Sequence, residues 1–486
     1  MSAPTQPLFA RLAAGGAAVV WVQALRLLLR LVSMVTLARL LSPLDFGIFG
    51  MAALVYGLLQ TVRDLGLSAA AMQQGSLTPG ESRLLFWLQS GAGLLVAAFT
   101  CVLAPLAAAF FAQPALQPLL YALAVSFLLQ GIGGQYRVEL GRELRFRTIS
   151  LIEAGGLVAG IVVAIALAFR GHGYWSLAAM ILVQECTTAL GLMLAAPVRL
   201  AGRAEFTGTG RFVRTGLQLA GFNLVQYAAQ MVDQAFVAVR FGSHALGLYG
   251  RAWQLGTLPT YGLVAGLTGW MIQGLVKLRD EPEAFRQWCR RILNTLAYVC
   301  LPLGAVLVVA PELILRCLLG HQWTEAAGLL RWLALSLPLQ PWLFAELWIL
   351  AASRRSRRLL LWSMVRLAAL ATALTIFAAA GPAAIAAIAV GVQWLLLPVS
   401  LWVIGRASPF RAWDLAAASV WPGLLGLVLG AALQLTRPWW EEAADLPAVL
   451  IITGIMLATT LALATSCPPL RRELRAALQM IHGRAG

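Results

Sequence analysis

Long apolar stretches, separated by short polar breaks, make up most of this chain. About fourteen of them are close to twenty residues long, enough for a helix to cross a hydrocarbon core of roughly 30 Å. This length excludes the short alternating strands of an outer-membrane barrel. The predicted spans are residues 17–41, 46–63, 84–112, 115–134, 148–169, 173–196, 211–241, 246–276, 290–310, 325–352, 359–380, 382–404, 412–435 and 447–466.

A polar stripe interrupts this pattern twice, at steps of three and four that place its members on one helix face. In the first span its members are Gln23, Arg26, Arg30 and Ser33. In the seventh span, 200 residues later, they are Asn223, Gln226, Gln230 and Asp233. A glycine motif follows at the same offset, as GIFGMA from Gly47 and GLYGRA from Gly247. The sequence therefore predicts a duplication.

The duplication predicts an all-α polytopic membrane protein with two parallel six-helix repeats around a central cavity, plus two peripheral helices. The predicted parts are an N-terminal lobe (1–200), a C-terminal lobe (201–406), two additional spans (407–467) and a cytoplasmic amphipathic tail (468–486). The amino-terminal apolar stretch lacks a small-residue cleavage site, so we expect it to be a retained span.

Composition and charge agree with a membrane protein. The 486 residues are 60% hydrophobic and 12% charged, with a net charge of +16. Under strict alternation, 26 of the 36 basic residues fall on one side of the membrane and six on the other. The positive-inside rule then predicts that both termini are cytoplasmic. Because the basic residues mark topology, they do not indicate nucleic-acid binding.

Arg26 and Arg30 are the main candidates for function, because charged groups in mid-span are expensive and usually face a hydrated cavity. Guanidinium groups match phosphate oxygens bidentately, which favours an anionic, phosphorylated substrate. Arg251 is a third candidate. The amides of Gln23, Asn223, Gln226 and Gln230 could bind sugar hydroxyls or hold helices together.

Two carboxylates are candidates for a coupling ion, Asp233 and Glu185. Each could receive a proton or a sodium ion, and Asp233 could instead pair with Arg30 or Arg251. Glu346 poses the same question, whereas Glu153 is interpreted as an interfacial residue. Six scattered cysteines have no ligand spacing, so we expect neither a metal nor a cofactor.

No loop exceeds about twenty residues, too few for a soluble catalytic domain of at least about fifty. Nucleotide-binding and metalloprotease motifs are also missing from the sequence. The sequence therefore predicts that the protein is not an enzyme and acts between its helices.

Several segments resemble the Wzx-type polysaccharide exporters of the multidrug/oligosaccharidyl-lipid/polysaccharide superfamily. These segments are ARLLSPLDFGIFGMA, RDLGLSAAAMQQ, GRELRFRTISLIE, VDQAFVAVRFGSHALGLYGRAW and LRWLALSLPLQ. The resemblance implies flipping of an undecaprenyl-pyrophosphate-linked oligosaccharide across the bacterial inner membrane by alternating access. It also implies contact with membrane lipids and with other polysaccharide assembly proteins. The family pattern in span seven falls on Asp233, but its usual Asn-Leu-Asp-Asn is Met231-Val232-Asp233-Gln234 here.

Three alternatives remain open from the sequence. A multidrug cation antiporter of the same fold would favour carboxylates in the cavity, where this stripe has arginines. A membrane-embedded glycosyltransferase or ligase would need a larger outward loop than the one around residues 312–325. A scaffold for a polysaccharide synthase would not require the arginines of the first span.

Overall fold

The computed structural model describes residues 25–63, 78–196, 209–278, 281–352, 356–377, 381–406, 408–443 and 445–466. Within these ranges the chain is helical and contains no strand. Among the described residues, ten helices are long and apolar enough to cross a membrane, and a shorter apolar helix spans Pro447–Leu463. The all-helical membrane architecture is therefore confirmed. The count of fourteen spans and the two repeats stay predictions.

The chain divides into two compact units, Met1–Met231 with Ala238–Gly247, and Val232–Val237 with Leu248–Gly486. The four-part division into 1–200, 201–406, 407–467 and 468–486 stays a prediction. The tail lies outside the described residues, as do residues 1–24.

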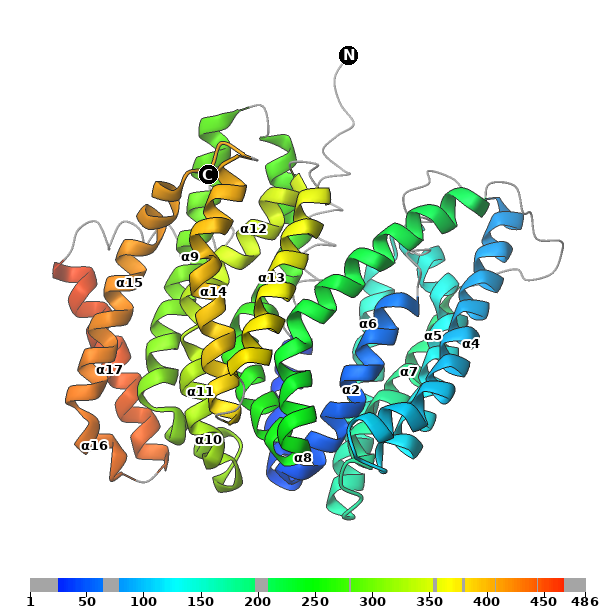
Figure 1. Ribbon diagram of the computed structural model, residues 1–486, viewed down its shortest axis with the longest axis horizontal. Coiled ribbons are helices and arrows are strands. Elements are labelled where there is room, and N and C mark those ends of the chain that lie inside the picture. The colour runs from blue at the N-terminus through cyan, green and yellow to red at the C-terminus, as the bar shows by residue number, and fades with distance from the viewer. Residues whose placement is uncertain are drawn as a thin grey trace. The chain divides into compact units, whose positions relative to one another are not determined.

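Within the described ranges, the first unit contains an opening helix at residues 25–40, five further helices and part of α8. Their bounds are α2 (Pro43–Arg63), α4 (Pro79–Phe110), α5 (Leu116–Arg142), α6 (Phe146–Phe169), α7 (Trp175–Ala195) and α8 (Thr209–Lys277). Helix α5 packs on α4 and α7, and α6 packs on α7, so the helices run alongside one another (Figure 1). Helix α4 begins at a capping box, in which Thr78 and Glu81 exchange side-chain and backbone hydrogen bonds.

Helix α8 contains the predicted seventh and eighth spans. Its hydrogen bonding is continuous over 69 residues, but Gly242 has φ 78° and ψ −172°, a conformation that side-chain-bearing residues rarely adopt. Two helices therefore meet at Gly242, as the spans ending at 241 and starting at 246 predict.

The second unit contains the remainder of α8 and the helices that follow. Their bounds are α9 (Pro282–Val309), α10 (Pro311–Leu318), η1 (His321–Ala326), α11 (Ala327–Ala334), η2 (Leu337–Leu339), α12 (Gln340–Ala352), α13 (Ser356–Phe377), α14 (Pro382–Gly405), α15 (Ala412–Leu435), α16 (Arg437–Glu441) and α17 (Asp445–Ser466). The predicted tenth span, 325–352, is broken at η2. Pro338 in η2 and Pro341 just after it lack the amide hydrogen that a continuous α-helix uses.

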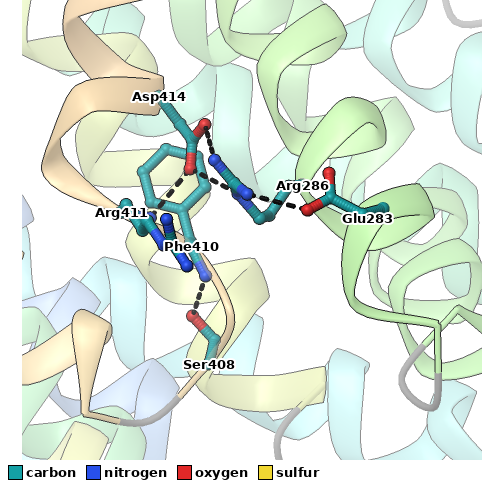
Figure 2. Close-up of polar contacts among 6 residues, drawn as sticks. All are labelled: Glu283, Arg286, Ser408, Phe410, Arg411 and Asp414. Atoms are coloured by element: carbon teal, nitrogen blue, oxygen red, sulfur yellow. Dashed lines mark hydrogen bonds and ion pairs between the residues drawn. The ribbon is translucent and has the colours of Figure 1, made fainter.

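The two last spans pack on the rest of their unit, α15 on α9 and α17 on α15. Arg286 of α9 forks onto Asp414 of α15, with Nε 3.0 Å from Oδ2 and Nη2 2.9 Å from Oδ1 (Figure 2). Glu283 accepts the remaining Nη1 donor at 2.9 Å, and Asp414 also accepts the backbone N–H of Arg411. This bidentate pair joins the start of α15 to α9.

In the first unit, the two motif glycines allow α2 and α8 to cross with their backbones in contact. A Cβ on Gly47 would overlap the carbonyl oxygen of Ser243, and a Cβ on Gly247 would overlap that of Pro43. The two contacts are related by the 200-residue offset: position 47 faces position 243, and position 247 faces position 43. Only glycine leaves room for this approach.

We expect Gly247→Ala to destabilise the protein by roughly 1–3 kcal/mol, because a backbone must move to admit the methyl group. Gly250→Ala is the matched control, since a Cβ there meets nothing within 4 Å. Thermal unfolding of both purified variants in one detergent measures the difference. Equal unfolding temperatures for the two variants would contradict the close crossing.

Candidate substrate-binding site

The first unit contains a network of charged side chains that joins the opening helix to α5 and α6. Arg26 of the opening helix donates from Nη2 to Glu153 Oε2 of α6 at 2.7 Å, and Arg137 Nη2 of α5 lies 2.7 Å from Glu153 Oε1. The Arg26 and Glu153 side chains are only 17% and 12% exposed. One carboxylate therefore joins arginines from two other helices.

Two further arginines and a second carboxylate lie within electrostatic range of this network. Arg30, an exposed residue one turn after Arg26, interacts with Arg26 and with Glu153. Glu185 of α7 interacts with Arg63, the last residue of α2, as well as with Arg137 and Glu153. We call these six residues the arginine cluster; its members are Arg26, Arg30, Arg63, Arg137, Glu153 and Glu185.

The arginine cluster has more positive than negative charge. It has four guanidinium groups and two carboxylates, so its formal net charge is +2 even with both carboxylates ionised. Among the described residues, nothing accepts a hydrogen bond from the buried Nε of Arg26 or of Arg63. The arrangement can therefore attract an anion and still offer it donors.

Neutral polar groups extend from the cluster between α2 and α5. Gln130 of α5 donates to the Tyr56 hydroxyl at 2.9 Å, and Gln60 lies 3.4 Å from Gln130 Oε1. The Tyr56 hydroxyl also accepts from Ser126 at 3.0 Å. Tyr56 is close enough to Glu185 and Arg63 to interact with both electrostatically. Such amide and hydroxyl groups suit the hydroxyls of a sugar.

The predicted stripe on α8 has a different environment. Asn223 and Gln230 are exposed and Gln226 is half-buried, all in the first unit. Gln23, their counterpart before Arg26, lies outside the described residues. The structure thus leaves the role of these amides a prediction.

The buried carboxylates of the second unit have neutral or basic partners. Asp233 is 6% exposed and accepts hydrogen bonds from the Tyr249 hydroxyl at 2.7 Å and from the backbone N–H of Gln234 at 2.8 Å. Glu346 accepts from Ser400 at 2.6 Å and lies 3.8 Å from Arg366 Nη1. Arg251 is half-buried and has further contacts. A coupling ion at Asp233 or Glu185 stays a prediction.

Sequence reasoning missed Arg63, Arg137 and Glu153. Arg63 is the last residue of the predicted span 46–63, Arg137 lies beyond the predicted span 115–134, and Glu153 is interpreted as an interfacial residue. Helix α5 continues to Arg142, eight residues beyond the predicted end of its span, and so places Arg137 on a helix beside α6. A usable signal was present, because Arg26 in mid-span requires a counter-charge and the chain has only 20 acidic residues.

Comparison with known proteins identifies the family. A family described as "Polysaccharide biosynthesis protein" matches residues 36–328, more than half of the chain. The chain belongs to this polysaccharide biosynthesis protein family, and the resemblance drawn from its motifs is confirmed at that level.

Among individual relatives, the chain is similar to the lipopolysaccharide biosynthesis protein WzxC of Escherichia coli (strain K12), with 24% identity over 62% of both chains. It is also 27% identical to the teichuronic acid biosynthesis protein TuaB of Bacillus subtilis (strain 168), over 57% of this chain and 58% of TuaB. A third relative is the succinoglycan biosynthesis transport protein ExoT of Rhizobium meliloti (strain 1021), 25% identical over 63% of this chain and 62% of ExoT. The chain thus spans about three fifths of the length of these curated relatives.

Two solved structures share the fold. The lipid II flippase MurJ in an inward closed conformation aligns with a TM-score of 0.71 and 14% identity, over 93% of this chain and 99% of MurJ. An inward-facing multidrug resistance MATE family transporter aligns with a TM-score of 0.57 and 15% identity, over 87% and 99%. At these identities the likeness concerns the fold alone.

We expect Glu153→Gln to destabilise the protein by roughly 1.5–3 kcal/mol, because it removes the negative charge shared by Arg26 and Arg137. The control is Glu143→Gln, since Glu143 is 48% exposed and 3.5 Å from Arg145; a change within about 0.5 kcal/mol is expected there. The free energy of unfolding in detergent is measured for Glu153→Gln, for Arg26→Gln and for the Arg26→Gln/Glu153→Gln double variant. The departure of the double variant from the sum of the two single variants gives the coupling energy. Additive effects would refute the Arg26–Glu153 interaction.

Proposed function

We propose that this protein flips a lipid-linked oligosaccharide, carried on undecaprenyl pyrophosphate, across the bacterial inner membrane by alternating access. The arginine cluster is the observation that carries the proposal. It has a net positive charge, and four of its six members lie on α2, α5, α6 and α7, which are apolar enough to cross a membrane. Family membership and the flippase-like fold support the same reading.

The chemistry of the cluster suits a pyrophosphate. This group cannot cross hydrocarbon without compensation of its charge, and guanidinium forks bind its oxygens in pairs. In the proposal Arg26 and Arg30 bind the phosphates, with Arg63 and Arg137 beside them. Gln23, Asn223, Gln226 and Gln230 bind sugar hydroxyls, and Arg251 adds a further cationic contact. Asp233 or Glu185 receives the coupling ion.

The finer topology is part of the proposal. Fourteen spans in two related six-helix lobes, with two additional helices, place both termini in the cytoplasm according to the distribution of basic residues. The two lobes enclose the substrate path and expose it alternately to each side of the membrane. Other proteins of polysaccharide assembly would supply and consume the substrate.

The rival functions make different demands. A cation exporter requires a net negative cavity, which the four arginines of the cluster oppose. Raised resistance to cationic dyes on expression would favour that rival. A glycosyltransferase or ligase would form a new glycosidic bond in a reconstituted system, whereas a flippase returns its substrate chemically unchanged.

We expect the Arg26→Ala/Arg30→Ala variant to lose at least about 90% of flipping, because the pyrophosphate loses its cationic partners. The measurement follows a fluorescent undecaprenyl-pyrophosphate sugar in proteoliposomes, by its protection from a membrane-impermeant quencher. Arg170→Ala is the control, since Arg170 is exposed at the opposite end of α6 from Glu153.

Folding is monitored in the same preparations by size-exclusion chromatography. A folded double variant that flips at the wild-type rate would overturn the proposed function, as would equal losses in the Arg170→Ala control.

A further inference from the structure

An apolar groove of about 360 Å³ opens on the surface of the first unit. Its two main walls come from α2 and α4, through Leu58, Leu59, Val62, Leu95, Val96 and Phe99. Leu95 and Phe99 are 72% and 55% exposed, so the groove is accessible along its α4 edge. The volume is within the range of ligand cavities, roughly 300–1,000 Å³.

The third wall of the groove is held in place by a tyrosine. Leu224 of α8 contributes this wall, and Tyr227, three residues later, donates its hydroxyl to the carbonyl oxygens of Ala53 and Leu54 at 3.2 Å each. Gly57 has no Cβ, which lets the Tyr227 ring lie against α2. The groove is thus a built feature of α2, α4 and α8.

The same two turns of α2 also contain Arg63 of the arginine cluster and the neutral polar groups next to it. Tyr56, Gln60 and Arg63 recur at steps of four and three on one face, which meets α5 through Gln130. Leu58, Leu59 and Val62 lie on another face and line the groove. One short piece of helix therefore offers a charged, hydrogen-bonding surface and a purely hydrocarbon surface.

We propose that this groove binds the polyisoprenyl chain of the lipid carrier while its pyrophosphate occupies the arginine cluster. The inference rests on the proposed function and adds a site for the tail. It requires an amphiphile with a strongly anionic head and an apolar chain, and the net charge of +2 in the cluster suits a pyrophosphate better than the single phosphate of a phospholipid. The groove accommodates part of one chain, and the carrier has a single chain for each head group.

The test uses the purified full chain in detergent and a benzophenone analogue of farnesyl pyrophosphate as the photoreactive probe. Labelled peptides are located by mass spectrometry. We expect labelling in 58–62 and 95–99 that undecaprenyl pyrophosphate suppresses at least about five-fold more strongly than phosphatidylglycerol does, equivalent to about 1 kcal/mol in affinity.

Groove-filling variants sharpen the test. Leu95→Trp and Leu224→Trp fill the groove from different walls and should each reduce labelling about five-fold. Leu106→Trp is the control, because Leu106 is 62% exposed on the same helix but outside the groove; its labelling should equal that of the wild type. Two substitutions on separate helices keep the result informative if one variant fails to fold.

Three results would overturn the groove assignment. The first is labelling that does not change in the groove-filling variants, and the second is equal competition by phosphatidylglycerol and undecaprenyl pyrophosphate. The third is a dimer that dissociates in these variants, which would identify a second copy of the chain as the occupant. If flipping is lost in Arg26→Ala/Arg30→Ala but continues at the wild-type rate in Leu95→Trp, only the groove assignment is refuted. If the wild-type protein is labelled in the groove but does not flip the substrate, only the proposed function is refuted.

Discussion

Compensation of buried charge is the constraint on which the first unit depends. A buried charged side chain that loses its counter-charge is strongly destabilising. Glu153 supplies the counter-charge for Arg26 and Arg137 and brings the opening helix, α5 and α6 to one point. The compensation is incomplete, because four arginines share two carboxylates. The positive charge left over is the feature that a structural ion pair would not need and that an anion-binding site does need.

Two buried carboxylates of the second unit and one of its arginines have direct hydrogen-bond partners. Asp233 and Glu346 are satisfied by hydroxyl donors at 2.7 Å and 2.6 Å, and Arg286 is matched by Asp414 in a bidentate pair. These groups stabilise packing among the helices of that unit. The arginine cluster of the first unit has more arginines than carboxylates, and this surplus is the reason for placing the head group of the proposed substrate there.

Much of the fold could be predicted from the sequence, because helix length and hydropathy are local properties. The break at Gly242 followed from where one apolar run ended and the next began. The predicted tenth span, 325–352, corresponds to the apolar span His321–Ala352, and its α-helix is interrupted at η2, where Pro338 and Pro341 lack amide hydrogens. The end of α5 was missed because hydropathy falls after residue 134 while the backbone hydrogen bonds continue to Arg142.

The site was predictable only in part, for a physical reason. Arg26 and Arg30 were identified by their cost in the membrane, which a sequence reveals without partners. Glu153, Arg137 and Arg63 act through their neighbours on other helices, and no spacing along the chain encodes which helices meet. The same holds for the apolar groove, whose walls come from α2, α4 and α8.

The most direct test of the central claim compares the binding of farnesyl pyrophosphate, farnesyl phosphate and farnesol to the purified protein by calorimetry in detergent. Surplus positive charge in the arginine cluster predicts affinities that fall in that order, by about tenfold or more at each step, or about 1.4 kcal/mol. It also predicts that Arg30→Gln reduces the difference in affinity between farnesyl pyrophosphate and farnesol. Equal affinities for the three ligands, unchanged in Arg30→Gln, would contradict the account.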